Sequence, residues 1–439
     1  MRQLGGTGPS PSGIGRLSSG GARAGGTSAG GTSSGALTAA IQAALAGAGV
    51  SDLAAGVRRL SATYRSGDAP AEQVLATKAD AAAYAAYRMP ATAAAMAQAL
   101  HQTRLSLPAW RPVTLLDMGA GTGSVAWAAA AQLPSVETMT LLEQSAAAIG
   151  LGRAILEAAE TRGAAEMPAL RAATFRTWRL PAGQSAGGEL AAGEPAVGQS
   201  AVGQSAGGDP VGGEPTVGEP TVGEPTVGEP TVGEPVGPPL PPAGPSLQPA
   251  GLPTADLATV SYVLGELTTA QQAAIVMLAV RMAPAVVLVE PGTPAGHRRI
   301  LAARELLLAA GYLLVAPCPH RDACPLAGGA DWCHFAARLP RSAVHRQVKA
   351  AELGYEDEKF SYVAAVRPDG PRAGGLSEPV LAAGRIVRRP QQRKGLVTLE
   401  VCRRDGTAGP ELIGKSARET YREARKSSWG DRWNHAVLP

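Results

Sequence analysis

Short apolar runs alternate with stretches of helical periodicity along much of the chain. The apolar runs predict strands at 113–118, 139–142, 174–180, 257–264, 286–290 and 312–315. Apolar residues at helical spacing predict helices between them, at about 124–133, 146–161, 269–282 and 298–310. Because strands and helices alternate, we expect an α/β fold with a doubly wound parallel sheet.

Two low-complexity segments lie outside this pattern. Residues 1–35 are rich in Gly and Ser, and residues 183–250 include four copies of Gly-Glu-Pro-Thr-Val between Gly213 and Val232. A proline at every fifth residue excludes both a continuous helix and ladder pairing. We therefore expect a disordered tail at 1–35 and a disordered acidic repeat insert at 183–250, within a loop of the sheet.

The other residues divide into three regions. Residues 36–110 are rich in Ala and predict an N-terminal helical region, with helices at about 71–88 and 91–105. Residues 111–182 and 251–316 carry the α/β pattern, which we assign to one domain. Residues 317–439 contain all four cysteines and an excess of basic residues. We expect this last region to be a separate C-terminal domain.

The basic residues concentrate near the end of the chain. The 439 residues have a formal net charge of +4, but residues 385–439 carry 13 Lys and Arg against six Asp and Glu. A basic surface beside a folded core favours a polyanionic partner, with nucleic acid the first candidate. A solvated basic helix without a partner is the alternative.

The sequence also indicates a compartment. No apolar run is long enough to span a membrane, no apolar signal-peptide segment occurs in the first thirty residues, and four cysteines are too few for a secreted disulfide scaffold. We expect a soluble, intracellular protein. The Arg-containing residues 1–51 resemble a transit peptide, but Arg is abundant throughout the chain, so we favour a bacterial, cytoplasmic protein over a mitochondrial one.

A glycine-rich loop follows the first predicted strand. Asp117 ends that strand, and Gly119, Gly121 and Gly123 open the next helix. The spacing differs from the dinucleotide pattern and fits the loop that binds S-adenosylmethionine (SAM) in Rossmann-like methyltransferases. Glu143 ends the second strand, where it could accept hydrogen bonds from ribose hydroxyls. The alternative is a structural glycine turn.

The sequence does not identify a methyl acceptor. Amino-methylating enzymes usually carry an Asn/Asp-Pro-Pro-aromatic motif at the fourth strand, and here that position reads Ser-Tyr-Val-Leu-Gly-Glu-Leu (Ser261–Leu267). Tyr262 or Glu266 could orient a substrate, but either could equally be a core or helix-start residue. Catalytic residues are therefore unknown.

The four cysteines suggest a metal site. Cys318, Cys324 and Cys333 lie within sixteen residues, and Cys402 follows much later. Structural zinc sites favour cysteines two to four apart, which neither short gap satisfies. A four-thiolate iron–sulfur cluster matches the count and the intracellular setting. His320 or His334 could be ligands instead, and four unrelated buried cysteines are the alternative.

Several segments resemble the methyltransferase-like family of small-ribosomal-subunit assembly factors, which has mitochondrial and bacterial members. The matching residues are Cys318–Leu326, Asp331–Phe335, Tyr355–Tyr362, Val289–Gly296, Tyr421, Ala424-Arg425-Lys426 and Trp429-Gly430-Asp431. The resemblance covers about residues 55–182 and 251–433. It implies a SAM-binding Rossmann-like domain, a [4Fe–4S] cluster on the four cysteines, and association with small-subunit ribosomal RNA.

The resemblance gives the basic region a candidate role in binding RNA. The candidate residues flank Cys402 or lead into its strand, and they are Arg385, Arg388, Arg389, Arg393, Lys394, Arg403 and Arg404. Trp429 and Trp433 could stack on bases, although packing onto the core is the interpretation we favour. We read Tyr355–Tyr362 as a half-buried strand.

Two functions remain open from the sequence. The first is a SAM-dependent rRNA methyltransferase whose cluster region positions the RNA. The second is an assembly factor that binds SAM, the cluster and rRNA without methyl transfer. The weak fourth-strand motif favours the second, whereas the glycine loop and Glu143 keep the first open. Whether the protein is an enzyme is therefore undecided, and we lean towards a SAM-dependent methyltransferase.

Overall fold

A computed structural model describes residues 28–66, 73–161, 167–181, 251–329, 331–342, 346, 353–368 and 379–435. The chain divides into two compact units, residues 1–185 with 253–439 and residues 186–252, and the described helices and strands belong to the first. The acidic insert predicted at 183–250 lies outside the described residues.

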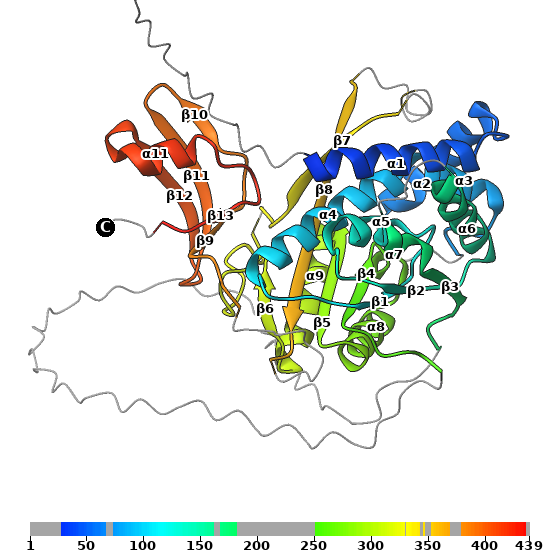
Figure 1. The fold of residues 1–439 in the computed structure, drawn as a ribbon. Helices are drawn as coiled ribbons and strands as arrows, with labels where there is room; N and C mark the ends of the chain where they lie inside the picture. The colour runs from blue at the N-terminus through cyan, green and yellow to red at the C-terminus, as the bar shows by residue number, and fades with distance from the viewer. Residues whose placement is uncertain are drawn as a thin grey trace, which may run out of the picture. The chain divides into compact units, whose positions relative to one another are not determined.

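The first sheet has eight strands in the order β3–β2–β1–β4–β5–β8–β6, with β7 paired to β8 (Figure 1). Its strands are β1 (Thr114–Met118), β2 (Thr138–Glu143), β3 (Ala173–Thr177), β4 (Leu257–Ser261), β5 (Ala285–Pro291), β6 (Leu313–Ala316), β7 (Phe335–Pro340) and β8 (Tyr355–Val366). Strands β1 to β5 pair in parallel, which confirms the predicted α/β fold. The sheet is not wholly parallel, because β8 runs antiparallel to both β5 and β6.

Strand β8 changes the predicted domain boundary. Its inner half lies between β5 and β6, and its outer half pairs with β7, with Phe335 opposite Phe360. Residues 335–366 therefore complete the first sheet. The boundary predicted at 316 does not separate the two sheets of the structure.

Helices cover this sheet on both faces. They are α1 (Ser28–Ala44), α2 (Val50–Ser66), α3 (Lys78–Tyr87), α4 (Met89–Ser106), α5 (Ser124–Gln132), α6 (Ala146–Thr161), α7 (Pro168–Arg171), α8 (Thr269–Met282) and α9 (Pro294–Ala309). Val287 and Val289 of β5 belong to the core shared with α1, α4 and α5. Val286 and Leu288 alternate with them and are also buried, so they face the opposite side, where α8 and α9 pack.

Two helix starts differ from the expectation. Residues 28–35, predicted as disordered tail, belong to α1, where the burial of Leu37 and Ile41 anchors the helix to the core. Helix α3 begins at Lys78 because Thr77 and Asp80 form a capping box. Thr77 Oγ1 accepts from Asp80 N at 3.1 Å, and Asp80 Oδ2 accepts from Thr77 N at 3.2 Å.

A second, five-stranded sheet contains most of the C-terminal residues. Its strands are β9 (Gly384–Ile386), β10 (Gln391–Arg393), β11 (Leu396–Arg403), β12 (Ala408–Gly414) and β13 (Arg432–Trp433). Helix α11 (Arg418–Ala424) lies between β12 and β13 along the chain. Buried Val397, Leu399, Val401 and Trp433 form its core. No helix in the described ranges is long and apolar enough to cross a membrane.

Candidate functional site

The glycine loop adopts a conformation that requires glycine. Gly119, Gly121 and Gly123 have φ values of +80°, +55° and +90°, in the left-handed region. A Cβ on Gly119 would lie 2.4 Å from Val263 Cγ2, whereas a Cβ on Gly121 would meet nothing closer than 3.9 Å. A Cβ at Gly121 would make only ordinary van der Waals contacts, with Leu75 and Tyr84, and because Gly121 lines a cavity a longer side chain there would extend into it.

Glu143 holds this loop from the end of β2. Its Oε2 accepts from Gly121 N at 2.8 Å, and its Oε1 accepts from Gln144 N at 2.8 Å and Ser145 N at 2.7 Å. Glu143 is 8 % exposed and lines a cavity of ≈ 350 Å³, a volume typical of small-molecule sites. The sequence-predicted residues Gly119, Gly121 and Glu143 therefore meet at one cavity.

Asp117 lies beneath the loop rather than at the cavity. It is fully buried, and its Oδ1 accepts from Thr259 Oγ1 at 2.7 Å, while its Oδ2 has no partner within the described residues. Burial, and secondarily the charge of Glu143, raise the pKa of Asp117 to about 7. Asp117 supports the strand from which the loop starts.

The two acceptor candidates, Tyr262 and Glu266, line the same cavity. Tyr262 has φ +60°, a left-handed conformation that is uncommon outside glycine. Its hydroxyl donates to Glu358 Oε1 at 2.9 Å, and Glu358 forms a bidentate ion pair with Arg88 at 3.0 and 2.8 Å. Burial, together with the Glu358 charge, raises the pKa of Tyr262 well above its ordinary value. Tyr262 therefore keeps its proton and is unsuited to act as a base.

No sequence pattern marked Arg88 or Glu358 as a site residue. Arg88 lies between α3 and α4, and Glu358 lies in β8, which is placed to contact Tyr262 because β8 folds back beside β5. The contact joins residues 270 positions apart, a separation at which periodicity carries no information.

The four cysteines come together at a second cavity. Cys318, Cys324, Cys333 and Cys402 all line it, three of them after β6 or before β7 and the last at the end of β11. Cys402 is brought there by the pairing of β11 with β9 and contacts His320 Nε2 at 3.4 Å. His334 instead stacks against Trp332 and meets Trp429 edge-on.

Burial raises the pKa of three of the four thiols, those of Cys318, Cys333 and Cys402. Burial, and then the proximity of Cys318 and Cys324, raise the pKa of Cys402 to about 12 and that of Cys333 well above its ordinary value. Across the described part of the chain, no three His, Cys, Asp or Glu side chains are grouped so that they could hold a single metal ion. The predicted iron–sulfur site therefore stays a prediction, carried by four thiols that share one cavity.

Three of the predicted RNA-binding arginines are structural. Arg385 is 2 % exposed and donates to Pro317 O, Gly430 O and Gln102 Oε1, so it is not available to phosphate. Arg388 pairs with Asp331 and donates to Trp332 O at 2.9 Å. Both contacts are with residues 317–333, which contain Cys318, Cys324 and Cys333 and which we call the cysteine loop.

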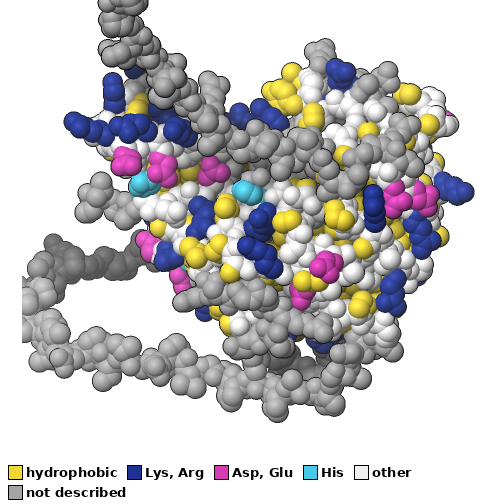
Figure 2. Space-filling view, viewed as in Figure 1, with side chains coloured by type: hydrophobic (Ala, Val, Ile, Leu, Met, Phe, Trp, Pro, Cys, Tyr) yellow, Lys and Arg dark blue, Asp and Glu magenta, His cyan; other side chains and the backbone are white. Residues whose placement is uncertain are grey.

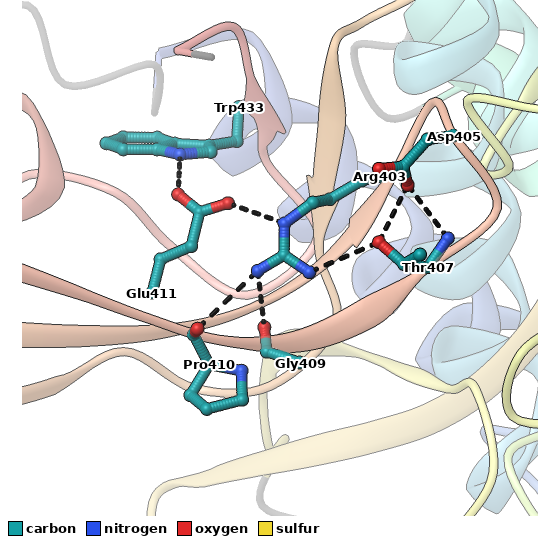
Figure 3. A network of polar contacts seen from close by, with 7 residues as sticks. All are labelled: Arg403, Asp405, Thr407, Gly409, Pro410, Glu411 and Trp433. Carbon is teal, nitrogen blue, oxygen red and sulfur yellow. Dashed lines mark hydrogen bonds and ion pairs between the residues drawn. The ribbon is translucent and has the colours of Figure 1, made fainter. Parts of the chain in front are cut away.

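Arg403 is held in a polar network of the second sheet (Figure 3). Its Nε donates to Glu411 Oε1 at 3.0 Å, and Glu411 Oε2 accepts from Trp433 Nε1 at 2.7 Å. Trp433 is 1 % exposed, and Trp429 packs partly buried against the first core. Both tryptophans therefore pack onto the protein, as we favoured over base stacking.

Exposed basic residues do gather on the second sheet. Figure 2 shows Lys and Arg side chains clustered over the region of β10 and α11. We define the basic face as seven exposed residues, Arg393, Lys394, Lys415, Arg418, Arg422, Arg425 and Lys426. Lys415 N donates to Gly395 O at 2.9 Å, and Gln392 Nε2 donates to Arg425 O at 2.9 Å, so the β10–β11 turn and α11 lie side by side. Arg389 and Arg404 are exposed outside this face.

Sheet order, glycine loop and cavity together define a methyltransferase-like α/β protein. The chain belongs to the family described as mitochondrial small ribosomal subunit Rsm22, whose family model matches residues 78–176 and 247–434, well over half of the sequence. This confirms the predicted resemblance to a methyltransferase-like small-subunit assembly family.

Named relatives include the human mitochondrial ribosome assembly protein METTL17, which is 25% identical over 366 residues. That match covers 79% of this chain and 61% of the human protein. Two Rsm22-cox11 tandem proteins of Schizosaccharomyces pombe are 30% identical over 178 residues, covering 33% of this chain and 24% of each relative. The chain thus spans about three fifths of the human relative and about a quarter of the yeast ones.

Similar solved structures include a putative RNA methyltransferase of Pyrococcus horikoshii, with a TM-score of 0.31 and 11% identity, covering 64% of this chain and 87% of that one. A precorrin-6y methyltransferase of Geobacter metallireducens has a TM-score of 0.30 and 14% identity, covering 62% of this chain and 87% of that one.

The raised pKa of Asp117 predicts a pH dependence of stability. The carboxyl of Asp117 loses its proton near pH 4 in the unfolded chain and near pH 7 in the folded chain. Protonated Asp117 therefore favours the folded state, and its contribution to the free energy of unfolding is complete below pH 4 and declines as the pH rises to 7. Asp117→Asn keeps an acceptor for Thr259 but cannot ionise. Relative to the parent, its free energy of unfolding should rise by up to about 4 kcal/mol between pH 4 and pH 8, measured by urea unfolding. A pH-independent difference would contradict the assignment.

Proposed function

We propose that this chain is a SAM-binding factor in assembly of the small ribosomal subunit, carrying a four-cysteine [4Fe–4S] cluster and binding small-subunit rRNA. The observation that carries the proposal is the family match, whose two segments contain the glycine-loop cavity and the thiol cavity. In a eukaryote the protein would act in the mitochondrial matrix, and in a bacterium in the cytoplasm.

The glycine-loop cavity suits SAM. The loop brings backbone close to the ligand space at Gly121, and the Glu143 carboxylate is fixed beside it by three backbone N–H groups. Carboxylate oxygens have enough lone pairs to accept ribose hydroxyls as well. Glu143 would then read the ribose while it holds the loop.

The far wall of the cavity favours binding without turnover. Tyr262 keeps its proton and donates to Glu358, whose other oxygen is occupied by Arg88. No Asn/Asp-Pro-Pro motif is present at this position. The second candidate, methyl transfer to rRNA, is favoured by one observation, since the cavity that would hold SAM extends to Tyr262 and Glu266.

Four thiols in one cavity match the ligand count of a [4Fe–4S] cluster, in which each thiolate binds a different iron. Cys318, Cys324, Cys333 and Cys402 would be the ligands, and binding would release their protons.

The basic face is our candidate for the rRNA contact. Its seven cations come from the β10–β11 turn and from the helical segment at residues 415–426. Hydrogen bonds join these two segments and so fix the spacing of the cations. Exposed Lys and Arg on a rigid surface suit phosphate contacts. Arg389 and Arg404 could extend it, while Arg385, Arg388 and Arg403 hold the protein together.

Reversing charge on the basic face should weaken rRNA binding. Arg393→Glu combined with Lys394→Glu removes two exposed cations from the β10–β11 turn without touching a core residue. The slope of log K against log salt should fall by about 0.7–0.9 for each lost phosphate contact, measured by filter binding to small-subunit rRNA. Arg171→Glu, an exposed cation on α7, is the control and should keep the parent slope. Equal slopes for both variants would rule out the basic face.

Filling the cavity at Gly121 should block SAM. Gly121→Arg places a long side chain in the cavity, and SAM affinity, measured by calorimetry, should fall at least about tenfold. RNA binding should persist, because the basic face lies on the other sheet. If subunit assembly proceeds normally with this variant, methyl transfer is not the essential role. Unchanged SAM affinity would instead exclude this cavity as the SAM site.

A further inference from the structure

Two buried cations line the thiol cavity, and no carboxylate of the described residues lines it with them. Arg304 and Arg385 both line it, and each is 2 % exposed. Glu305, the ion-pair partner of Arg304, is 64 % exposed and therefore largely solvated. Arg385 donates only to uncharged acceptors, on Pro317, Gln102 and Gly430.

The carboxylate of Asp431 lies near enough to interact with Arg385, but it accepts from Ser428 N at 2.8 Å, and no ion pair joins it to Arg385 within the described ranges. Arg388, which lies near enough to Cys333 to interact with it electrostatically, is already paired with Asp331. An uncompensated buried ion costs several kcal/mol, so a neighbouring negative charge is expected.

The same cavity also has polar atoms without partners. Arg304 Nε, Tyr362 Oη and His320 Nδ1 are buried and have no hydrogen-bond partner among the described residues. All three residues line the cavity, and each is at least nine-tenths buried. Buried polar groups in native proteins are almost always hydrogen-bonded. Arg304 Nε can only donate, and the Tyr362 hydroxyl can donate, so one acceptor group in the cavity could satisfy both.

We propose that Arg304, Arg385 and Tyr362 form a cationic, hydrogen-bonding pocket for an anionic metal–thiolate group, with Arg304 Nε and Tyr362 Oη donating to its sulfur atoms. Four thiolates around a [4Fe–4S]²⁺ core leave two net negative charges, which the two guanidinium groups balance. The inference rests on the proposed four-thiolate site. It adds positioning residues outside the ligand set.

These residues should set the reduction potential and the retention of the group. Reduction adds negative charge, which nearby cations and hydrogen-bond donors favour. Removing a guanidinium charge or the Tyr362 hydroxyl should therefore shift the midpoint potential to more negative values. Arg385 also joins the cysteine loop to β9, so its loss should speed release of the group as well.

The test uses the full chain purified without oxygen. Tyr362→Phe removes only the unpartnered hydroxyl, and Arg304→Gln and Arg385→Gln each remove one charge. Chelator-driven iron loss should be roughly 10- to 100-fold greater in the Arg variants, and the midpoint potential should become more negative in all three. Arg385→Lys keeps the positive charge but not the guanidinium hydrogen bonds. Compared with Arg385→Gln, it should restore the midpoint potential more fully than the retention of iron.

Two matched variants control for general destabilisation. Tyr312→Phe removes a buried hydroxyl that bonds Val280 O at 2.9 Å, away from the cavity. Arg299 lies on the same helix as Arg304, and Arg299→Gln breaks its ion pair with Glu290. Both should keep the parent potential and iron retention, and far-UV circular dichroism checks that every variant is folded.

The outcomes separate this inference from the proposed cluster. An iron-loaded parent whose Arg304, Arg385 and Tyr362 variants match it in potential and retention would overturn the inference and leave the cluster standing. A parent that holds zinc would overturn the cluster, and reduced zinc affinity of the same variants would then support the charge pocket. A parent that holds no metal would overturn both.

Discussion

The thiol cavity depends on the hydrogen bonds that the buried Arg385 side chain donates. From β9 it reaches Pro317 in the cysteine loop, Gln102 in α4 and Gly430 before β13. The register pairs Arg385 with Cys402 on β11, so the same short strand places the distant cysteine beside the local three. Without this junction Cys402 would have no fixed position relative to Cys318. A buried cation thus organises both the fold and the chemistry.

The two cavities are linked through β8. Its outer half carries Glu358, which fixes Tyr262 at the glycine-loop cavity. Its inner half carries Ser361, which donates to Cys333 O at 2.8 Å, and Tyr362, which lines the thiol cavity. One strand therefore lines the thiol cavity directly and supports the glycine-loop cavity through Tyr262. This arrangement is consistent with a binding role as much as with catalysis.

Much of the fold could be predicted from local pattern. Apolar runs predicted β1, β2, β4 and β5, and the glycine spacing predicted the loop. Each of these signals is contained in a few consecutive residues, so it can be recognised without knowledge of distant contacts. The reversal at β8 could not be predicted, since an antiparallel strand between β5 and β6 depends on packing between distant segments. The same limit applies to Arg385, predicted to contact RNA and found buried against a residue 283 positions away. Charge content indicated a basic surface, but only the arrangement of β10 and α11 shows which cations remain exposed.

The central claim is that the four thiols hold an iron–sulfur cluster at this junction. The most direct test is iron and acid-labile sulfide analysis, with a visible absorption spectrum, on the parent chain purified without oxygen. We predict about four irons and about four sulfides per chain, with the broad visible absorption of a cubane cluster. Zinc alone, or no metal in a folded chain, would contradict the claim and leave Cys318, Cys324, Cys333 and Cys402 as a zinc site or as core residues.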